Sequence, residues 1–204
     1  MWDIIQCSGP VLWVVAVIFL SGAAAFITFV ERGFHLHRAR IKADDFLHGI
    51  LNILKAGNIE EALAICDETP GPVARIARTA ILHRAEGREM LDAAVNDSGL
   101  SEISRLESRV GVISTVAQIA PLLGLLGTVL GMMTLLGDLE VSQWQSARVT
   151  LGLKHALTAT AAGLIVAVPC YVAYNLVVGK IESLVVEMER VASEVTAFLR
   201  SQNK

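Results

Sequence analysis

Residues 120–134 read Ala-Pro-Leu-Leu-Gly-Leu-Leu-Gly-Thr-Val-Leu-Gly-Met-Met-Thr, and this stretch decides the fold. It lies inside a run without charged residues, Val110 to Gly137, that is long enough to cross a bilayer as a helix. A second charge-free run, Ala156 to Gly179, follows after a short polar break. Each run carries one threonine among small residues, Thr128 and Thr160. We interpret the two runs as membrane-spanning helices that line a polar path.

The composition supports a membrane protein. Hydrophobic residues make up 53% of the 204 residues and charged residues only 18%, with a mean hydropathy of +0.55. A soluble domain of this size is rarely so apolar. The net charge of −3 gives no reason to expect nucleic acid as a partner. The three cysteines, Cys7, Cys66 and Cys170, form no CxxC or Cys/His spacing, so we expect packing roles and neither a metal nor a cofactor.

A third apolar run, Val11 to Val30, predicts the first spanning helix, with Pro10 suited to its first turn. A cleaved signal peptide is the competing interpretation, because small residues follow at 22–25. No lysine or arginine precedes the run, and the run is longer than a signal core needs. We therefore expect a helix that stays in the membrane.

The positions of lysine and arginine predict the orientation. They are absent before the first run, dense directly after it, sparse between the second and third runs, and present again after the third. The positive-inside rule then places the N-terminus outside and the C-terminus inside. The predicted order is an outer (periplasmic) segment 1–10, spanning helix 11–30, cytoplasmic helical domain 31–109, spanning helix 110–137, outer loop 138–150, spanning helix 151–179 and cytoplasmic C-terminal helix 180–204.

The two cytoplasmic segments have helical patterns. Apolar residues recur at three and four residues through 31–109, with breaks at Gly57-Asn58 and at 69–72. The tail carries an apolar stripe from Ile181 to Leu199, with its glutamates mostly off the stripe. We expect this stripe to pack on the 31–109 helices or on neighbouring subunits. A helix lying on the lipid surface is the alternative, which the acidic polar face disfavours. The predicted fold class is an all-α membrane protein whose second and third spanning helices extend into a cytoplasmic helical domain.

Small residues in the second and third runs predict close packing of the helices. Such residues let helix backbones approach in lipid, where no hydrophobic force drives association. Proline is tolerated in spanning helices when neighbours satisfy the carbonyls that it frees. The residues expected to pack the path are Pro121, Gly124, Gly127, Gly131, Gly163, Pro169 and Asn175.

The two threonines allow two interpretations. Each hydroxyl can bond to the carbonyl four residues earlier in its own helix. Alternatively, Thr128 and Thr160 face a polar path and meet an ionisable group there. None of the three runs contains an aspartate or glutamate. Either there is no ion path, or the titrating group belongs to another polypeptide.

The motifs of both runs resemble those of a known family. Ala120-Pro-x-x-Gly-Leu-x-Gly-Thr-Val-x-Gly-Met resembles the second-helix motif of the ExbB/TolQ/MotA group. Ala156-Leu-Thr-Ala-Thr-Ala-Ala-Gly-Leu-Ile-Val-Ala-Val-Pro resembles the third-helix motif. Glu31-Arg32 and Tyr174-Asn175 also fit the group. The length and the three spans favour ExbB/TolQ over the four-span flagellar stator.

This resemblance implies a proton-driven motor of the bacterial inner membrane. Similar proteins form homopentamers whose second and third helices line a pore that holds two copies of a single-span ExbD/TolR-like partner. An aspartate in the partner's span carries the proton and faces threonines that match Thr128 and Thr160. Its protonation is thought to permit rotation, which energises a TonB- or TolA-like protein acting at the outer membrane, for example in transport. Bound membrane lipid is also expected.

One residue departs from the family pattern. His155 stands where the family places a glutamate near the outer start of the third helix. Histidine titrates near neutral pH, so His155 is a candidate for gating proton entry. A histidine at the membrane surface with no gating role is the alternative, and this position leaves the choice between proton and sodium open.

Two other classes of function remain for comparison. A structural membrane scaffold would recruit a partner through its inner domain without conducting ions. A membrane enzyme would need a catalytic set of residues, and the sequence contains no phosphate-binding loop and no catalytic constellation with useful spacing. We therefore do not expect an enzyme.

Overall fold

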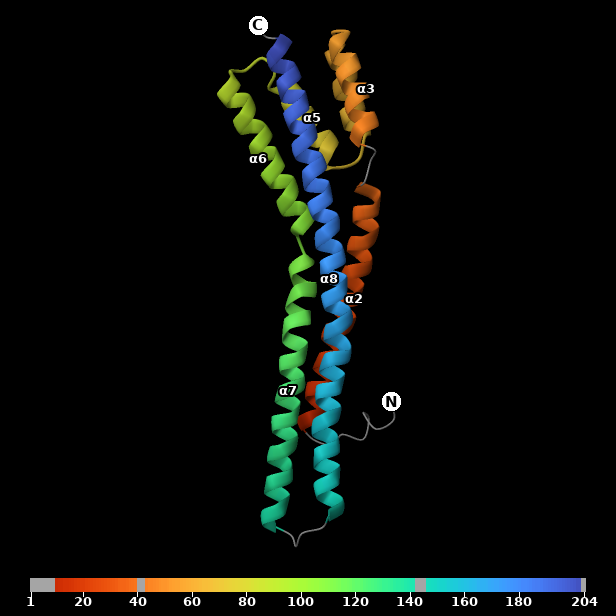
Figure 1. The fold of residues 1–204 in the computed structure, drawn as a ribbon, viewed down its shortest axis with the longest axis vertical. Coiled ribbons are helices and arrows are strands. Elements are labelled where there is room, and N and C mark those ends of the chain that lie inside the picture. Colours follow the sequence, from red (N-terminus) through yellow and green to blue (C-terminus); the bar gives the residue numbers. More distant parts are fainter. Residues whose placement is uncertain (1–9, 40–42, 142–145, 203–204) are drawn as a thin grey trace. The chain divides into compact units, whose positions relative to one another are not determined.

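The computed structural model describes residues 10–39, 43–141 and 146–202, and every element in these ranges is a helix (Figure 1). This confirms the predicted all-α class with three apolar spans. Cys7, nearly all of the predicted segment 1–10 and the centre of the predicted loop 138–150 lie outside the described residues. The helices are α2 (Pro10–Ala39), α3 (Ala43–Lys55), α4 (Ile59–Glu68), α5 (Pro72–Leu82), α6 (Arg88–Glu107), α7 (Val110–Val141) and α8 (Ser146–Gln202).

The chain divides into two compact units. The apolar unit comprises Met1–Glu31 and Arg109–Leu176, and the polar unit comprises Arg32–Ser108 and Val177–Lys204. Helices α2 and α8 contribute residues to both units. Helix α8 runs without a break through 179–180, so no structural boundary separates the predicted span 151–179 from the predicted tail 180–204.

Within the part of the chain that the structure describes, three helical segments are long and apolar enough to cross a membrane. They are Val11–Phe34, Val110–Leu136 and Gly152–Gln202, and less than a third of the most apolar part of each is buried within the chain. The side chains that remain exposed include Trp13, Leu20 and Ile165. Apolar surface of this extent requires lipid or other subunits around it. The chain is a multi-pass membrane protein.

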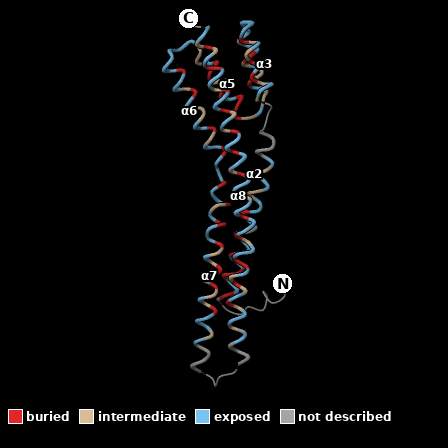
Figure 2. The backbone as a smooth tube through the Cα atoms, viewed as in Figure 1, coloured by how far each residue is buried: buried red, intermediate tan, exposed pale blue. Residues whose placement is uncertain are grey.

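Among the described residues, two small clusters of side chains from all three spans hold the apolar unit together. In one, Val11 and Val15 of α2 contact Ala159 and Ala162 of α8, with Leu130 of α7 against them. The second cluster joins the same three helices through Ala25, Ile113, Val116, Ala117 and Cys170. Figure 2 shows buried stretches alternating with exposed ones along the helices. The three spans therefore pack through narrow seams and leave their other faces outward.

A charged pair marks one end of the apolar unit. Arg109, between α6 and α7, has a φ of 65°, a left-handed conformation that few residues other than glycine adopt. Its Nη1 donates to Glu31 Oε1 of α2 at 2.7 Å. Charged side chains are costly in the hydrocarbon core of a bilayer, so we expect this pair to lie near the membrane surface. It therefore marks where the spanning parts of α2 and α7 end.

The polar unit buries the apolar stripe of α8. Leu47, Ile50 and Leu54 of α3 and most of α5 are buried, as are positions of α8 spaced at three and four residues. Gly71, with a φ of 126°, precedes Pro72 and allows the turn into α5. The stripe predicted in the tail is thus covered within its own chain at Ile181, Leu184, Met188, Val191, Val195 and Leu199.

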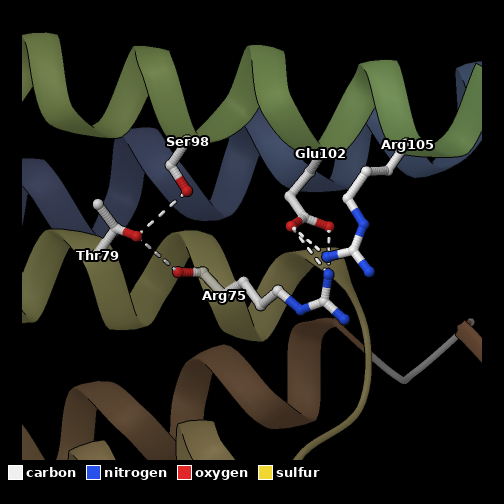
Figure 3. Close-up of polar contacts among 5 residues, drawn as sticks. All are labelled: Arg75, Thr79, Ser98, Glu102 and Arg105. Carbon is white, nitrogen blue, oxygen red and sulfur yellow. Dashed lines mark hydrogen bonds and ion pairs between the residues drawn. The ribbon is translucent and has the colours of Figure 1, made fainter.

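A buried carboxylate joins α5 to α6. Glu102 is 8% exposed, and both of its oxygens accept hydrogen bonds from Arg75 Nη1, at 2.9 and 2.8 Å (Figure 3). Arg105 Nη1 lies 3.5 Å from Glu102 Oε1. One turn away, Thr79 Oγ1 donates to Ser98 Oγ at 3.1 Å.

We predict that Arg75→Ala destabilises the α5–α6 pair by about 1–3 kcal/mol, because it leaves the Glu102 carboxylate buried without its main partner. Arg78→Ala is the matched control, since Arg78 pairs with an Asp67 side chain that is 58% exposed and an exposed pair contributes about 1 kcal/mol or less. Native-state hydrogen exchange of the α5 and α6 amides measures both. Equal protection in the two variants would contradict the role given to Glu102.

The Cys66 thiol of α4 is predicted to be unreactive in the folded protein. Burial raises its pKa to about 11, with Asp67 adding to the effect and Arg78 opposing it. A rise of about two pKa units above that of the free thiol lowers the thiolate fraction at pH 8 about a hundredfold. Iodoacetamide labelling at pH 8, followed by peptide mass spectrometry, should be slow in the native protein and fast in urea. Fast native labelling would show that the thiol is neither buried nor protonated.

Candidate functional site

All of the predicted site residues lie on α7 and α8 of the apolar unit. Pro121 and Pro169 lie inside helices that continue past them. Asn175 is exposed on α8, near the end of the apolar unit. The remaining site residues are Gly124, Gly127, Thr128 and Gly131 on α7, and His155, Thr160 and Gly163 on α8.

The glycines bring the α7 and α8 backbones together. A Cβ atom placed on Gly127 would lie 2.4 Å from the Cβ of Ala159, and one on Gly163 would lie 2.6 Å from the carbonyl oxygen of Ala120. A Cβ on Gly131 would lie 3.0 Å from the Cβ of Ala156. Real Cβ atoms essentially never approach as closely as at Gly127 and Gly163, so the α7–α8 contact requires glycine there, and the contact at Gly131 is tighter than most.

Thr160 takes part in this contact. Its Oγ1 donates to the carbonyl oxygen of Gly124 across the two helices, at 3.4 Å. A Cβ on Gly124 would in turn lie 3.2 Å from the Cα of Thr160. The hydroxyl is therefore at the seam between the helices, and its bond goes to α7 rather than to its own helix.

Thr128 is half-buried, and its hydroxyl donates to its own helix. The acceptor is the carbonyl oxygen of Leu125, at 2.6 Å. A hydroxyl has one proton to donate and two lone pairs that accept. In both threonines the proton is committed to a backbone carbonyl, which leaves the oxygens of Thr128 and Thr160 as acceptors for water or for a protonated acid.

His155 is half-buried on α8. It directly precedes Ala156, the residue against which Gly131 packs. It lies five residues before Thr160 along the same helix. His155 therefore lies beside the α7–α8 contact, one residue closer to the start of α8 than Ala156.

The site has hydroxyls, one imidazole and backbone carbonyls. No group of three or more histidine, cysteine, aspartate or glutamate side chains within the described ranges has a geometry that could hold a metal ion. Sequence reasoning did not single out Ser114 and Gln118, whose side chains bond to each other on α7 at 3.2 Å. The sequence could have indicated them, because both are polar residues within a charge-free run.

These features define the class of the protein: a helical multi-pass membrane protein whose second and third spans are joined through glycine contacts, with the Thr160 hydroxyl between them. Residues 68–190, more than half of the chain, match the MotA/TolQ/ExbB proton channel family. The chain belongs to this family.

Individual relatives agree with the family. The chain is 26% identical to the biopolymer transport protein ExbB of Salmonella typhimurium over 213 aligned residues, which cover 96% of this chain and 84% of the relative. It is 38% identical to ExbB of Aquifex aeolicus over 45% of this chain and 63% of the relative. It is 34% identical to the Tol-Pal system protein TolQ of Haemophilus influenzae over 53% of this chain and 48% of the relative. For three of the matched relatives the chain spans about two thirds of their length or less, at 66%, 63% and 57%.

We predict that Gly127→Ala destabilises the apolar unit by about 1–3 kcal/mol, because the new methyl group overlaps Ala159. Gly111→Ala is the control on the same helix, since nothing lies within 4 Å of a Cβ there. Thermal unfolding of the detergent-solubilised protein measures both. Adding Ala159→Gly to Gly127→Ala should recover most of the loss, and a double variant no better than the single one would show that the overlap is not the cause.

Proposed function

We propose that this chain is an ExbB/TolQ-like subunit of an ion-driven motor in the bacterial inner membrane. It forms a homopentamer whose α7 and α8 helices line a pore, and an ExbD/TolR-like single-span dimer occupies that pore. The motor uses the proton motive force to energise a TonB- or TolA-type process at the outer membrane, such as transport. The N-terminus is periplasmic and the C-terminus is cytoplasmic.

The observation that carries this proposal is a hydroxyl-bearing seam between the two charge-free runs, 110–137 and 156–179, which contain no aspartate or glutamate. Thr160 joins α8 to α7 through Gly124, and Thr128 lies one turn further along α7. A path that moves protons needs a group that titrates, and an intramembrane carboxylate is the usual one. The partner's aspartate supplies that group in this proposal.

The threonines then act on the partner's acid in one protonation state more than in the other. The protonated carboxyl can donate to a threonine oxygen that already gives its own proton to a carbonyl. The ionised carboxylate instead requires donors or water, because an unpaired charge is costly in a low-dielectric pore. Loss of the proton therefore changes which contacts favour the acid, and this difference can drive a movement.

The exposed faces of the apolar unit support assembly with further subunits. Large apolar side chains on α7 and α8 point away from the seams of their own chain. Helices in lipid associate through close packing and polar contacts, so such faces accommodate neighbouring subunits as well as lipid. The exposed members include Leu122, Leu125, Met133, Leu157, Ile165, Val168 and Tyr171.

His155 takes the position of the family glutamate in this proposal. An imidazole can accept a proton near neutral pH and pass it on, as a carboxylate would. Its position directly before Ala156, which packs against Gly131, supports a place near the outer end of the proposed path. Its role in proton entry is part of the proposal.

We predict that Thr128→Val and Thr160→Val each lower proton-driven flux about tenfold, the effect of losing a hydrogen bond worth about 1.4 kcal/mol to a charged or titrating group. Thr158→Val is the control on α8, since Thr158 is not among the residues that lie against the α7 glycines, and its hydroxyl bonds to the Lys154 carbonyl of its own helix at 2.7 Å. The measurement uses the purified complex in liposomes that contain a pH-sensitive dye, with a potassium diffusion potential.

The alternative function, a structural scaffold, gives a different result. It predicts that both site variants keep full function and that the small partner still copurifies. If liposomes that contain the wild-type complex pass no protons while the partner is recruited normally, the result would support the scaffold and contradict the motor.

A further inference from the structure

An amide side chain lies deep in the second span. Gln118 follows Arg109 by nine residues on α7, which is about 13 Å along a helix. Arg109 pairs with Glu31 and marks the charged end of the span. The cluster of Ile113, Val116 and Ala117 with α2 and α8 lies at the level of Gln118. Gln118 is therefore inside the apolar span.

The amide faces away from its own chain. Ala117 and Val116 point into the seam with α2 and α8, whereas Gln118 is exposed. Gln118 Nε2 donates to Ser114 Oγ at 3.2 Å. An amide has two donors and a carbonyl acceptor, so this bond uses only part of its capacity. In hydrocarbon the rest would cost several kcal/mol.

Gln118 lies on the same stripe of α7 as Thr128. Ser114, Gln118, Pro121, Leu125 and Thr128 recur at intervals of four, three, four and three residues. Such spacing keeps side chains within one narrow band of a helix. Gln118 and Thr128 are ten residues apart, which places them about 15 Å from each other along the helix.

We propose that Gln118, held by Ser114, is a second polar point on the ion path, between the Thr128 level and the charged end at Glu31 and Arg109. Its free amide capacity orders water on this stripe, so that an ion leaving the Thr128 level meets water rather than apolar side chains. Gln118 is a positioning residue, because it does not titrate. This inference rests on the proposed function, since it assumes that the Thr128 stripe faces the pore.

Thiol accessibility tests the inference without relying on ion flux. In a chain with Cys7, Cys66 and Cys170 replaced by alanine, Leu125→Cys is compared with Leu126→Cys. Both leucines are exposed and adjacent, and only Leu125 is on the stripe. In membrane vesicles, a charged methanethiosulfonate should label Leu125→Cys about tenfold faster, because the reagent enters through water only.

Adding Gln118→Leu should slow labelling of Leu125→Cys about fivefold, because the stripe loses the amide that holds water on it. Thr115→Val is the matched control, since its hydroxyl bonds to the Gly111 carbonyl of its own helix at 2.8 Å. Equal labelling of the two cysteine variants, or labelling that Gln118→Leu leaves unchanged, would overturn the inference.

The flux assay separates this inference from the motor. Gln118→Leu should lower flux about fivefold while the small partner still copurifies, and Thr115→Val should leave flux unchanged. Wild-type flux with no effect of Gln118→Leu would overturn the inference and leave the motor intact. Absence of flux from the wild type would overturn both.

Discussion

The close approach of α7 and α8 is the constraint on which the rest of the apolar unit depends. Lipid offers no hydrophobic gain for bringing helices together, so their association needs backbone contact and polar groups. Gly127 and Gly163 permit that contact, and Thr160 adds a hydrogen bond to the Gly124 carbonyl. Because glycine is needed for the approach, the same residues that hold the helices together also bring the Thr160 hydroxyl to the seam. In the proposed motor, packing and function therefore cannot be separated at these positions.

The polar unit is stabilised by a different balance of forces. Its helices are short, and they gain stability by burying apolar faces against α8 in water, as the buried Ile181 and Val195 show. The Arg75–Glu102 pair adds a specific polar link between α5 and α6. A long α8 thus serves two environments, with small residues in its first half and a regular apolar stripe in its second half.

Much of this structure could be predicted from the sequence, because the decisive signals are local. Charge-free runs predicted the three spans, and the stripe after Ile181 predicted a packed tail. Pairing between helices is not local. The spacing of glycines marked a close contact, but it could not show that Thr160 bonds to α7 while Thr128 bonds to its own helix. Gln118 was missed because its significance lies in its depth and exposure, which follow from Arg109 and from the cluster around Ala117.

The prolines extend the same reasoning to what surrounds the chain. Proline has no N–H, so Pro169 leaves the carbonyl of Ile165 without its donor in the helix. Ile165 is 66% exposed, so this residue of α8 lies on a face that its own chain does not cover. Pro121 frees the carbonyl of Ala117 in the same way, but Ala117 is buried in the seam. In a membrane each freed carbonyl needs a donor or a protein cover. In the proposed assembly, a neighbouring subunit that packs on the exposed face around Ile165 would supply this cover.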